Sequence, residues 1–228
     1  MIIQTDSTVF NTNADCIVNT INCVSFMGKG LALEFALRYP KLEKIYKEQC
    51  LKKIIHTGEV YFYEIDGQKI VNFPTKFHFK YPSKIEWIEQ GLISFISNYK
   101  KWDIKSVAFP ILGANNGGLN PIEVEKLMIE YLSKIDIDVY ICKSILVEGK
   151  EKEMIDAFLT TDIVELSKHI KLNQKQIENL KNNQKNIYKF SQISNVEGIG
   201  IVTYKSIYYY FYNEQQNKEK CVQLALEL

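Results

Sequence analysis

Two glycine-rich loops are the part of this sequence best suited to hold a ligand by its phosphates. The first, Met27-Gly28-Lys29-Gly30, lies between a short apolar run at residues 16–18 and a helical pattern. The second, residues 113–118, contains three glycines and follows a strand-like segment at residues 105–110. Glycine lets the backbone approach a ligand closely, and the N–H groups at the start of a helix attract anions. The two loops together predict a site that clamps a diphosphate.

Neither loop matches the common phosphate-binding fingerprints. The dinucleotide pattern Gly-x-Gly-x-x-Gly is missing, and no lysine-serine pair completes a P-loop. In an open α/β sheet, ligands bind beyond the carboxyl ends of the strands, where both loops are expected to lie. The alternative is that the glycines only form turns. A single glycine-rich loop would favour that alternative, but two such loops after parallel strands favour a ligand site.

The segments around these loops alternate between strand-like and helical patterns from residue 1 to about residue 140. Strands are expected at 1–3, 15–20, 58–65, 69–73, 105–110 and 138–142, and helices at 30–49, 83–100 and 122–134. Asp66-Gly67 is a strong hairpin signal, and Ser83 with Glu86 has the spacing of a capping box. This alternation predicts an α/β domain of three layers, with a buried sheet between helices.

The character of the sequence changes near residue 150. A helical pattern at 151–172 is followed by a stretch rich in Asn, Gln and Lys and then by a stretch rich in Tyr and Ile at 187–212. We therefore predict a first domain over residues 1–150 and a small helical region over residues 151–228.

Charge and cysteine usage narrow the choice of partners and compartment. The 228 residues carry a formal net charge of +1, and Arg38 is the only arginine, so bidentate arginine contacts to guanine are nearly excluded. The five cysteines are scattered, the three histidines are isolated, and no apolar run could span a bilayer. These features predict a cytoplasmic protein with reduced thiols, no zinc site, no signal peptide and no membrane partner.

Three blocks of sequence resemble one protein family. They are residues 18–32, residues 57–59 followed by 71–78, and residues 110–113 followed by 117–121. In this order and spacing they resemble the macrodomain family, and within it the branch of DarG-type DNA ADP-ribosyl glycohydrolases, close to relatives that remove terminal ADP-ribose from proteins. The most discriminating part is Asn72-Phe73-Pro74-Thr75-Lys76. The resemblance implies a three-layer α/β/α macrodomain with a mixed central sheet, followed here by the small helical C-terminal region.

The same resemblance implies that ADP-ribose binds across both glycine loops. Asn22 would face the distal ribose with Lys29 beside it, and Asp6 would hold the adenine amino group. The implied ADP-ribose-binding residues are Asp6, Ser7, Asn22, Met27, Gly28, Lys29, Gly30, Leu31, Thr75, Gly113, Ala114, Asn115, Asn116, Gly117 and Gly118. ADP-ribose is then a ligand and product, and no cofactor or metal is implied.

Lys76 and Asn22 are the catalytic candidates that follow from the resemblance. Breaking a glycosidic bond requires a nucleophile or a group that stabilises oxocarbenium-like charge, and a lysine of lowered pKa can form a Schiff base with a ring-opened sugar. Related protein-directed enzymes pair this lysine with an acidic residue where this sequence has Gly117. That departure favours DNA-linked over protein-linked ADP-ribose. The alternative is that Lys76 is a surface lysine after a Pro-Thr turn. A further residue of the same block, His78, is a weaker candidate for contact with the ligand.

Two further departures from the family pattern concern the second loop. Asn115-Asn116 replaces the usual Gly-Leu, which could stiffen or reshape the diphosphate clamp. Asn120 stands where the DNA-directed relatives often have aspartate. Neither departure removes the candidate lysine.

Residues 190–212 resemble a helix-hairpin-helix motif centred on Gly198-Ile199-Gly200. In that motif backbone N–H groups of the turn contact a DNA phosphate, and Lys205 could add charge to the contact. Two alternatives remain open: a surface that binds a toxin partner, and a helical cap whose core contains Tyr204, Ile207, Tyr208 and Phe211.

The resulting hypothesis is an ADP-ribosyl glycohydrolase that removes ADP-ribose from thymidine in modified DNA and so reverses a DarT-like toxin. Its expected partners are ADP-ribose, ADP-ribosylated DNA and the toxin itself. Two alternatives are a glycohydrolase acting on protein-linked or guanine-linked ADP-ribose, and a non-enzymatic reader of ADP-ribose or a related nucleotide.

Overall fold

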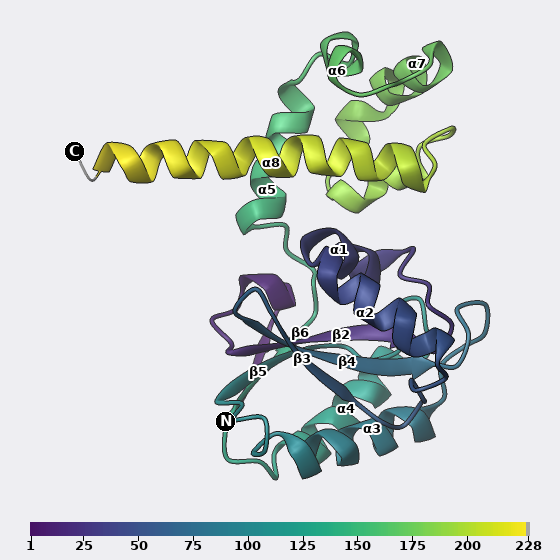
Figure 1. Cartoon of the computed structure of the whole chain (residues 1–228), viewed down its shortest axis with the longest axis vertical. Coiled ribbons are helices and arrows are strands. Elements are labelled where there is room, and N and C mark those ends of the chain that lie inside the picture. Colours follow the sequence, from purple (N-terminus) through teal and green to yellow (C-terminus); the bar gives the residue numbers. More distant parts are fainter. Residues whose placement is uncertain (227–228) are drawn as a thin grey trace. The chain divides into compact units, whose positions relative to one another are not determined.

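The computed structural model describes residues 1–226, with side chains described as far as residue 213 (Figure 1). The chain divides into two compact units, Met1–Leu146 and Val147–Leu228. The first unit contains a sheet with helices on it, and the second contains helices. Cysteines 16, 23, 50 and 142 are free thiols, and the side chain of Cys221 lies outside the described residues.

A six-stranded mixed sheet forms the centre of the first unit, in the order β1-β6-β5-β2-β4-β3. The strands are β1 (Ile2–Thr5), β2 (Cys16–Asn22), β3 (Tyr61–Ile65), β4 (Gln68–Lys76), β5 (Ser106–Pro110) and β6 (Asp138–Cys142). All neighbours run parallel except β3, which pairs antiparallel with β4. The turn of that hairpin has positive φ at both Asp66 (51°) and Gly67 (82°), as the Asp-Gly signal predicted.

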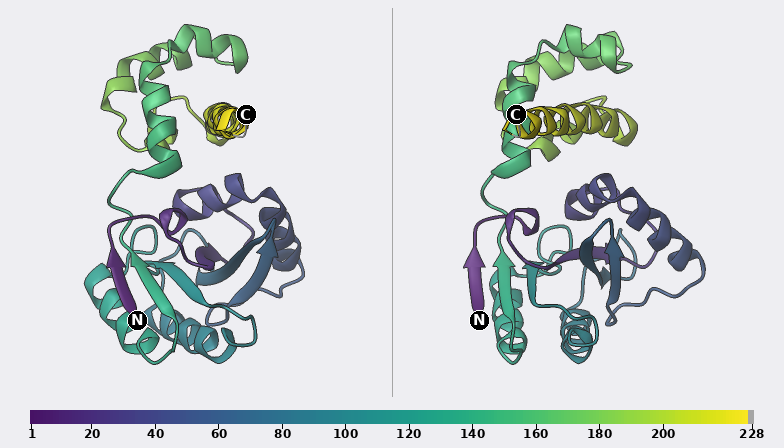
Figure 2. Two further views of the ribbon diagram at one scale, coloured as in Figure 1. Left: turned by 90° about the vertical axis from the view of Figure 1, so that its left-hand side faces the viewer. Right: turned by 60° about the vertical axis from the view of Figure 1, so that its left-hand side comes forward.

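Helices cover both faces of this sheet and make three layers (Figure 2). Helices α1 (Gly30–Arg38) and α2 (Pro40–Leu51) lie on one face, and α3 (Ile85–Asn98) and α4 (Pro121–Leu132) lie on the other. Because side chains alternate along a strand, Cys16 and Val18 of β2 pack toward α3 and α4, whereas Ile17 packs toward α1 and α2. The predicted α/β/α architecture with a mixed central sheet is confirmed.

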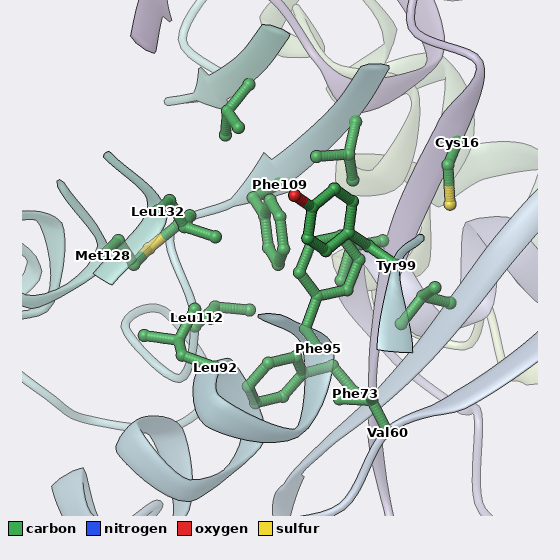
Figure 3. Close-up of a cluster of buried hydrophobic side chains, with 14 of the residues drawn as sticks. Cys16, Val60, Phe73, Leu92, Phe95, Tyr99, Phe109, Leu112, Met128 and Leu132 are labelled. Atoms are coloured by element: carbon green, nitrogen blue, oxygen red, sulfur yellow. The ribbon is translucent and has the colours of Figure 1, made fainter. Parts of the chain in front are cut away.

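The larger core lies under α3 and α4 (Figure 3). Phe95 of α3 meets Phe109 of β5 edge to face, with ring centroids 5.1 Å apart. Phe73 of β4 packs so close to α3 that a Cβ on Gly91 would lie 2.3 Å from its ring. Glycine at position 91 therefore lets β4 approach the helix, and β4 carries Lys76 three residues after Phe73.

Strand β4 is longer than the sequence predicts, because the ladder continues past Pro74 to Lys76. Strand β3 pairs with β4 only as far as Asn72. Pro74 therefore lies where β4 has a single partner strand, which is the setting in which a sheet tolerates a residue without an N–H group. The extension places Lys76 at the carboxyl end of the sheet.

Two predictions about helices in the first unit are wrong. The helix expected at 30–49 is broken at Tyr39, which has φ −128° and ψ 72° because proline at position 40 disfavours helical backbone before it. The predicted capping box at Ser83 does not form: α3 begins at Ile85 after Lys84, which makes no side-chain cap. Ser83 is instead buried, and its backbone N–H donates to the carbonyl of Gly117 (2.9 Å).

The second unit is built from α5 (Gly149–Thr160), α6 (Ile163–His169), α7 (Gln174–Asn183) and α8 (Ile201–Leu226), with short 3-10 turns at Gln184–Asn186 and Phe190–Asn195. The helix expected at 151–172 is interrupted at Asp162, whose side chain caps α6. Tyr204, Ile207, Tyr208 and Phe211 of α8 are all buried, in a small core with Phe158 and Phe190. Among the described residues, no helix is long and apolar enough to cross a membrane.

Candidate functional site

The carboxyl ends of five parallel strands meet at one edge of the sheet, and the loops that follow them carry the predicted site residues. Three of these loops, residues 23–30, 76–84 and 111–120, contain four lysines and no acidic residue. The edge is therefore suited to an anionic ligand before any single residue is considered.

Asn22 is the last residue of β2 and is almost fully buried. Its Oδ1 accepts hydrogen bonds from the backbone N–H of Val24 (2.9 Å) and from the Tyr46 hydroxyl (3.0 Å), and its Nδ2 donates to the carbonyl of Phe26 (2.7 Å). Burial raises the pKa of Tyr46, so its hydroxyl stays protonated and remains a donor. Asn22 therefore shapes the first loop, and the second hydrogen on its Nδ2 is left to donate to a ligand.

The first glycine loop is folded tightly at the start of α1. Ser25 and Gly30 both have φ of +58°, and Lys29, the residue before α1, makes no side-chain cap. The first N–H groups of α1 are thus left for another acceptor. A Cβ on Gly28 would lie 2.1 Å from the Phe26 ring, so glycine is needed for that ring to lie over the loop. Met27 is buried in the core and offers a ligand only its backbone.

The second glycine loop has φ of +65° at Gly113 and +77° at Gly118. It is closed by hydrogen bonds from the N–H of Gly118 to Ala114 (2.8 Å) and from the N–H of Leu119 to Gly113 (3.1 Å). A Cβ at Gly117 would lie 2.0 Å from the carbonyl oxygen of Gly113, a backbone atom. This loop shape therefore excludes any side chain at position 117, including the acidic residue of the protein-directed relatives.

The two loops meet at Lys76. Its Nζ donates to the backbone carbonyl of Asn116, and the side-chain nitrogen of Asn116 lies 2.7 Å from where a Cβ on Gly30 would stand. Lys76 also pairs with Asn22 across the β2–β4 ladder. Partial burial lowers the pKa of Lys76 from its ordinary value, which increases the fraction of neutral, nucleophilic amine.

Cys23 is the other nucleophilic side chain beside Lys76, and its thiol donates to the Lys76 carbonyl (3.4 Å). Burial raises the pKa of Cys23 to about 11, so the thiolate is scarce at neutral pH. Among the described residues, no group of three His, Cys, Asp or Glu side chains could hold a metal ion. Lys76 is therefore the stronger candidate nucleophile of the two side chains.

Other predicted residues lie at the same edge but farther along it. Asp6 and Ser7 follow β1, and two strands, β6 and β5, separate β1 from β2. Both are held through their backbone: Ile145 donates to Asp6 (2.8 Å) and Ser144 donates to Ser7 (3.0 Å). The Asp6 side chain is exposed. Of the remaining predicted residues, Thr75 is buried and Leu31 half-buried beside the loops, and within the second loop Ala114 is buried and Asn115 exposed.

Two further residues have structural explanations. Asn120 is the N-cap of α4, where its Oδ1 accepts from Ile122 N–H (3.0 Å), and aspartate would cap the helix equally well. His78 stacks on Phe79, with ring centroids 4.4 Å apart. Sequence reasoning missed Phe26 and Phe79, which contact each other at 4.7 Å beside the site. The repeated aromatic residues after Lys76 were the available signal.

Comparison with known proteins finds relatives of the first unit. The family model described as Macro domain matches residues 18–128. A protein of Mycobacterium tuberculosis (strain ATCC 25618 / H37Rv), named DNA ADP-ribosyl glycohydrolase, is 38% identical over 146 residues, which are 62% of this chain and 42% of that protein. The chain thus spans 42% of the length of this curated relative.

Two solved structures are similar to the first unit. The macrodomain of Mycobacterium tuberculosis DarG has a TM-score of 0.61 at 35% identity, and the match covers 62% of this chain and 97% of that one. Thermosipho africanus DarTG in complex with ADP-ribose has a TM-score of 0.58 at 31% identity, with 64% of this chain and 42% of that one covered.

Proposed function

This chain belongs to the macrodomain family, and on that premise we propose that it is a glycohydrolase that removes ADP-ribose from modified DNA. The observation that carries the proposal is Lys76: an amine of lowered pKa, at the edge where the two glycine loops meet. The names of its relatives, DNA ADP-ribosyl glycohydrolase and DarTG in complex with ADP-ribose, support the same activity.

ADP-ribose would lie along the carboxyl edge of the sheet. The diphosphate takes the backbone amides of the two glycine loops and the uncapped start of α1. The adenine end extends toward Asp6 and Ser7, and the distal ribose lies against Asn22 and Lys76. Four lysines in the three loops offset the charge of the ligand.

Lys76 would perform the covalent step. The distal ribose opens as its C1–O4′ bond breaks, O4′ takes up a proton, and C1 becomes doubly bonded to the base nitrogen. The neutral Nζ adds to C1, and the bond from C1 to the base then breaks with its electron pair leaving on the base, which takes up a proton. Water then hydrolyses the Schiff base and regenerates the amine. Asn22, whose side chain is fixed by three hydrogen bonds, positions the sugar.

DNA-linked ADP-ribose is the proposed substrate rather than protein-linked ADP-ribose, because position 117 cannot hold a carboxylate in this loop. A Cβ there would meet Gly113 O at 2.0 Å and Ser83 Oγ at 2.5 Å. The attached base is proposed to be thymine, and the reaction is proposed to reverse a DarT-like toxin, which is also a proposed binding partner.

The second unit is proposed to contact DNA through its hairpin at Gly198-Ile199-Gly200. Gly198 has φ of +82°, and α7 holds this turn: Gln176 donates to the Gly198 carbonyl (2.8 Å) and Asn179 to the Glu197 carbonyl (2.9 Å). The turn leads directly into α8, so backbone N–H groups at the start of α8 could meet a phosphate.

The location of the protein is proposed to be cytoplasmic. The four free thiols among the described cysteines support this location.

The test is release of ADP-ribose from an oligonucleotide carrying ADP-ribosylated thymidine. We expect wild-type protein to release it and Lys76→Ala to lose release while still binding ADP-ribose in calorimetry. Lys101→Ala, an exposed lysine before β5 at the opposite end of the sheet, is the matched control and should keep full activity. Full release by Lys76→Ala would refute the mechanism. Release from guanine-linked DNA or glutamate-linked protein alone would change the substrate, and binding without any turnover would identify a reader.

A further inference from the structure

Four aromatic rings form a continuous row beside Lys76, three of them exposed and the fourth, His78, half-buried. Phe26, on the loop after β2, lies 4.7 Å from Phe79 between ring centroids; Phe79 stacks on His78 at 4.4 Å; and His78 lies 5.5 Å from Tyr81. Phe26 is 48% exposed, Phe79 40% and Tyr81 65%. We call these four residues the aromatic row.

The row is not an extension of the core. The phenylalanines that pack in this unit, such as Phe35, Phe73 and Phe109, are fully buried. Keeping large rings in water forgoes the free energy of burying them, so a contiguous exposed group of them indicates a binding surface.

The backbone fixes the row against the active edge. The N–H of Cys23 donates to the Phe77 carbonyl (3.1 Å), which joins the two loops that carry the rings. The N–H groups of Lys80 and Tyr81 both bond to His78, at 3.2 Å to Nδ1 and 3.1 Å to the carbonyl. Gly28 leaves room for Phe26 to lie over the first glycine loop. The rings are therefore held in place beside Lys76.

Positive charge accompanies the rings. The segment Lys76-Phe77-His78-Phe79-Lys80-Tyr81-Pro82-Ser83-Lys84 alternates lysines with aromatic residues and contains no acidic residue. The Lys80 ammonium lies 6.0 Å from the Phe79 ring centroid. Rings that stack on bases, interleaved with cations that meet phosphates, are the chemistry by which proteins hold a single nucleic-acid strand. A duplex hides its base faces, so it cannot use the row.

We propose that the aromatic row binds unpaired DNA bases next to the modified nucleotide, with Lys80 and Lys84 on the flanking phosphates. This proposal rests on the proposed function and adds to it the surface that positions the DNA strand at the site. The row positions the strand so that the sugar bearing the ADP-ribose reaches Lys76.

The first experiment uses the full-length protein and an unmodified oligothymidylate, and measures affinity by fluorescence anisotropy. Because stacking on one aromatic ring contributes about five- to hundredfold to affinity, we expect Phe79→Ala and Phe26→Ala each to weaken binding by about tenfold. Ile93→Ala is the matched control, since Ile93 is also 48% exposed but lies on α3, and it should not change affinity. The oligothymidylate carries no ADP-ribose, so this readout does not depend on turnover.

The second experiment separates stacking from a structural role. Phe79→Leu keeps an apolar side chain without a ring and should bind as weakly as Phe79→Ala, whereas Phe79→Trp should bind like wild type. On ADP-ribosylated substrates, Phe79→Ala should raise KM for an oligonucleotide and leave kcat/KM for the ADP-ribosylated nucleoside unchanged.

Unchanged oligothymidylate affinity in both alanine variants would overturn the proposal. Wild-type affinity in Phe79→Leu would also overturn it, as would an equal loss of kcat/KM on the ADP-ribosylated nucleoside and the ADP-ribosylated oligonucleotide in Phe79→Ala. Binding of a toxin protein that depends on these rings while DNA affinity does not would assign the row to a protein partner and also overturn it. Absence of any turnover by wild type, with ring-dependent DNA binding intact, would count against the proposed function alone.

Discussion

Substituting Gly117 tests the steric reasoning about the second loop most directly. In Gly117→Ala the new Cβ would lie 2.0 Å from Gly113 O, and because real Cβ contacts are essentially never under 3.0 Å, the backbone must move by at least 1.0 Å. The movement breaks two loop hydrogen bonds, from Gly118 and Leu119. Each contributes about 0.5–1.5 kcal/mol, for a loss of about 1–3 kcal/mol. For a domain of this size the melting temperature falls roughly 2–4 °C per kcal/mol.

Ligand affinity should fall with the same change, because the loop amides that hold the diphosphate are displaced. Losing one hydrogen bond to a charged group costs about 1.5–3 kcal/mol, so ADP-ribose should bind roughly ten- to hundredfold more weakly in calorimetry. Gly200→Ala is the control, since nothing lies within 4 Å of a Cβ there. Adding Ser83→Ala should not restore binding, because the main conflict is with backbone. Wild-type affinity and melting temperature in Gly117→Ala would refute the reasoning.

Three further predictions concern residues that form or support the site. Burial lowers the pKa of Lys76 below its ordinary 10.5, so the single-turnover rate should rise with pH through that lowered pKa as the amine loses its proton; a rate that falls over this range would contradict the nucleophilic role. Gly91→Ala places a Cβ 2.3 Å from the Phe73 ring, and overpacking of about 1–3 kcal/mol should exceed the gain of about 1 kcal/mol in helix propensity, with a lower urea midpoint. Tyr46→Phe removes the donor to Asn22 and should cost about 1–3 kcal/mol in denaturation experiments and reduce kcat; unchanged values of both would show that the bond is dispensable.

Local sequence signals identified the features that depend on neighbouring residues. Asp66-Gly67 predicted a hairpin because few other residue pairs accept positive φ twice in succession. Both glycine loops follow strands. Because the strands are parallel, their carboxyl ends lie at the same edge of the sheet, so the sequence alone predicts that the two loops lie together. Pro40 is also a local signal, because proline disfavours helical backbone at the residue before it and so divides the expected helix at Tyr39.

Features that depend on distant residues could not be predicted from the sequence. Ser83 has the spacing of a capping box with Glu86, but its backbone N–H bonds to Gly117, thirty-four residues away. The burial of Asn22 depends on Tyr46 of α2, and no pattern near either residue indicates the pair. Ser25, a serine with φ of +58°, sets the loop that presents Phe26. In each case a tertiary contact decides the role of the residue.

The position of Lys76 itself results from an irregularity in the sheet. The β2–β4 ladder pairs Ile21 with Pro74 and then Asn22 with Lys76, so Thr75 is an extra residue on β4. Because side chains alternate faces along a strand, one extra residue changes the face toward which every later side chain points. Thr75 thereby brings Lys76 beside Asn22 and under the Asn116 carbonyl. Gly91, which admits Phe73, and Ser83, which bonds to Gly117, secure β4 before and after this point. A lysine in the same sequence block on a regular strand would lack this placement, so the bulge at Thr75 is as necessary to the site as the lysine.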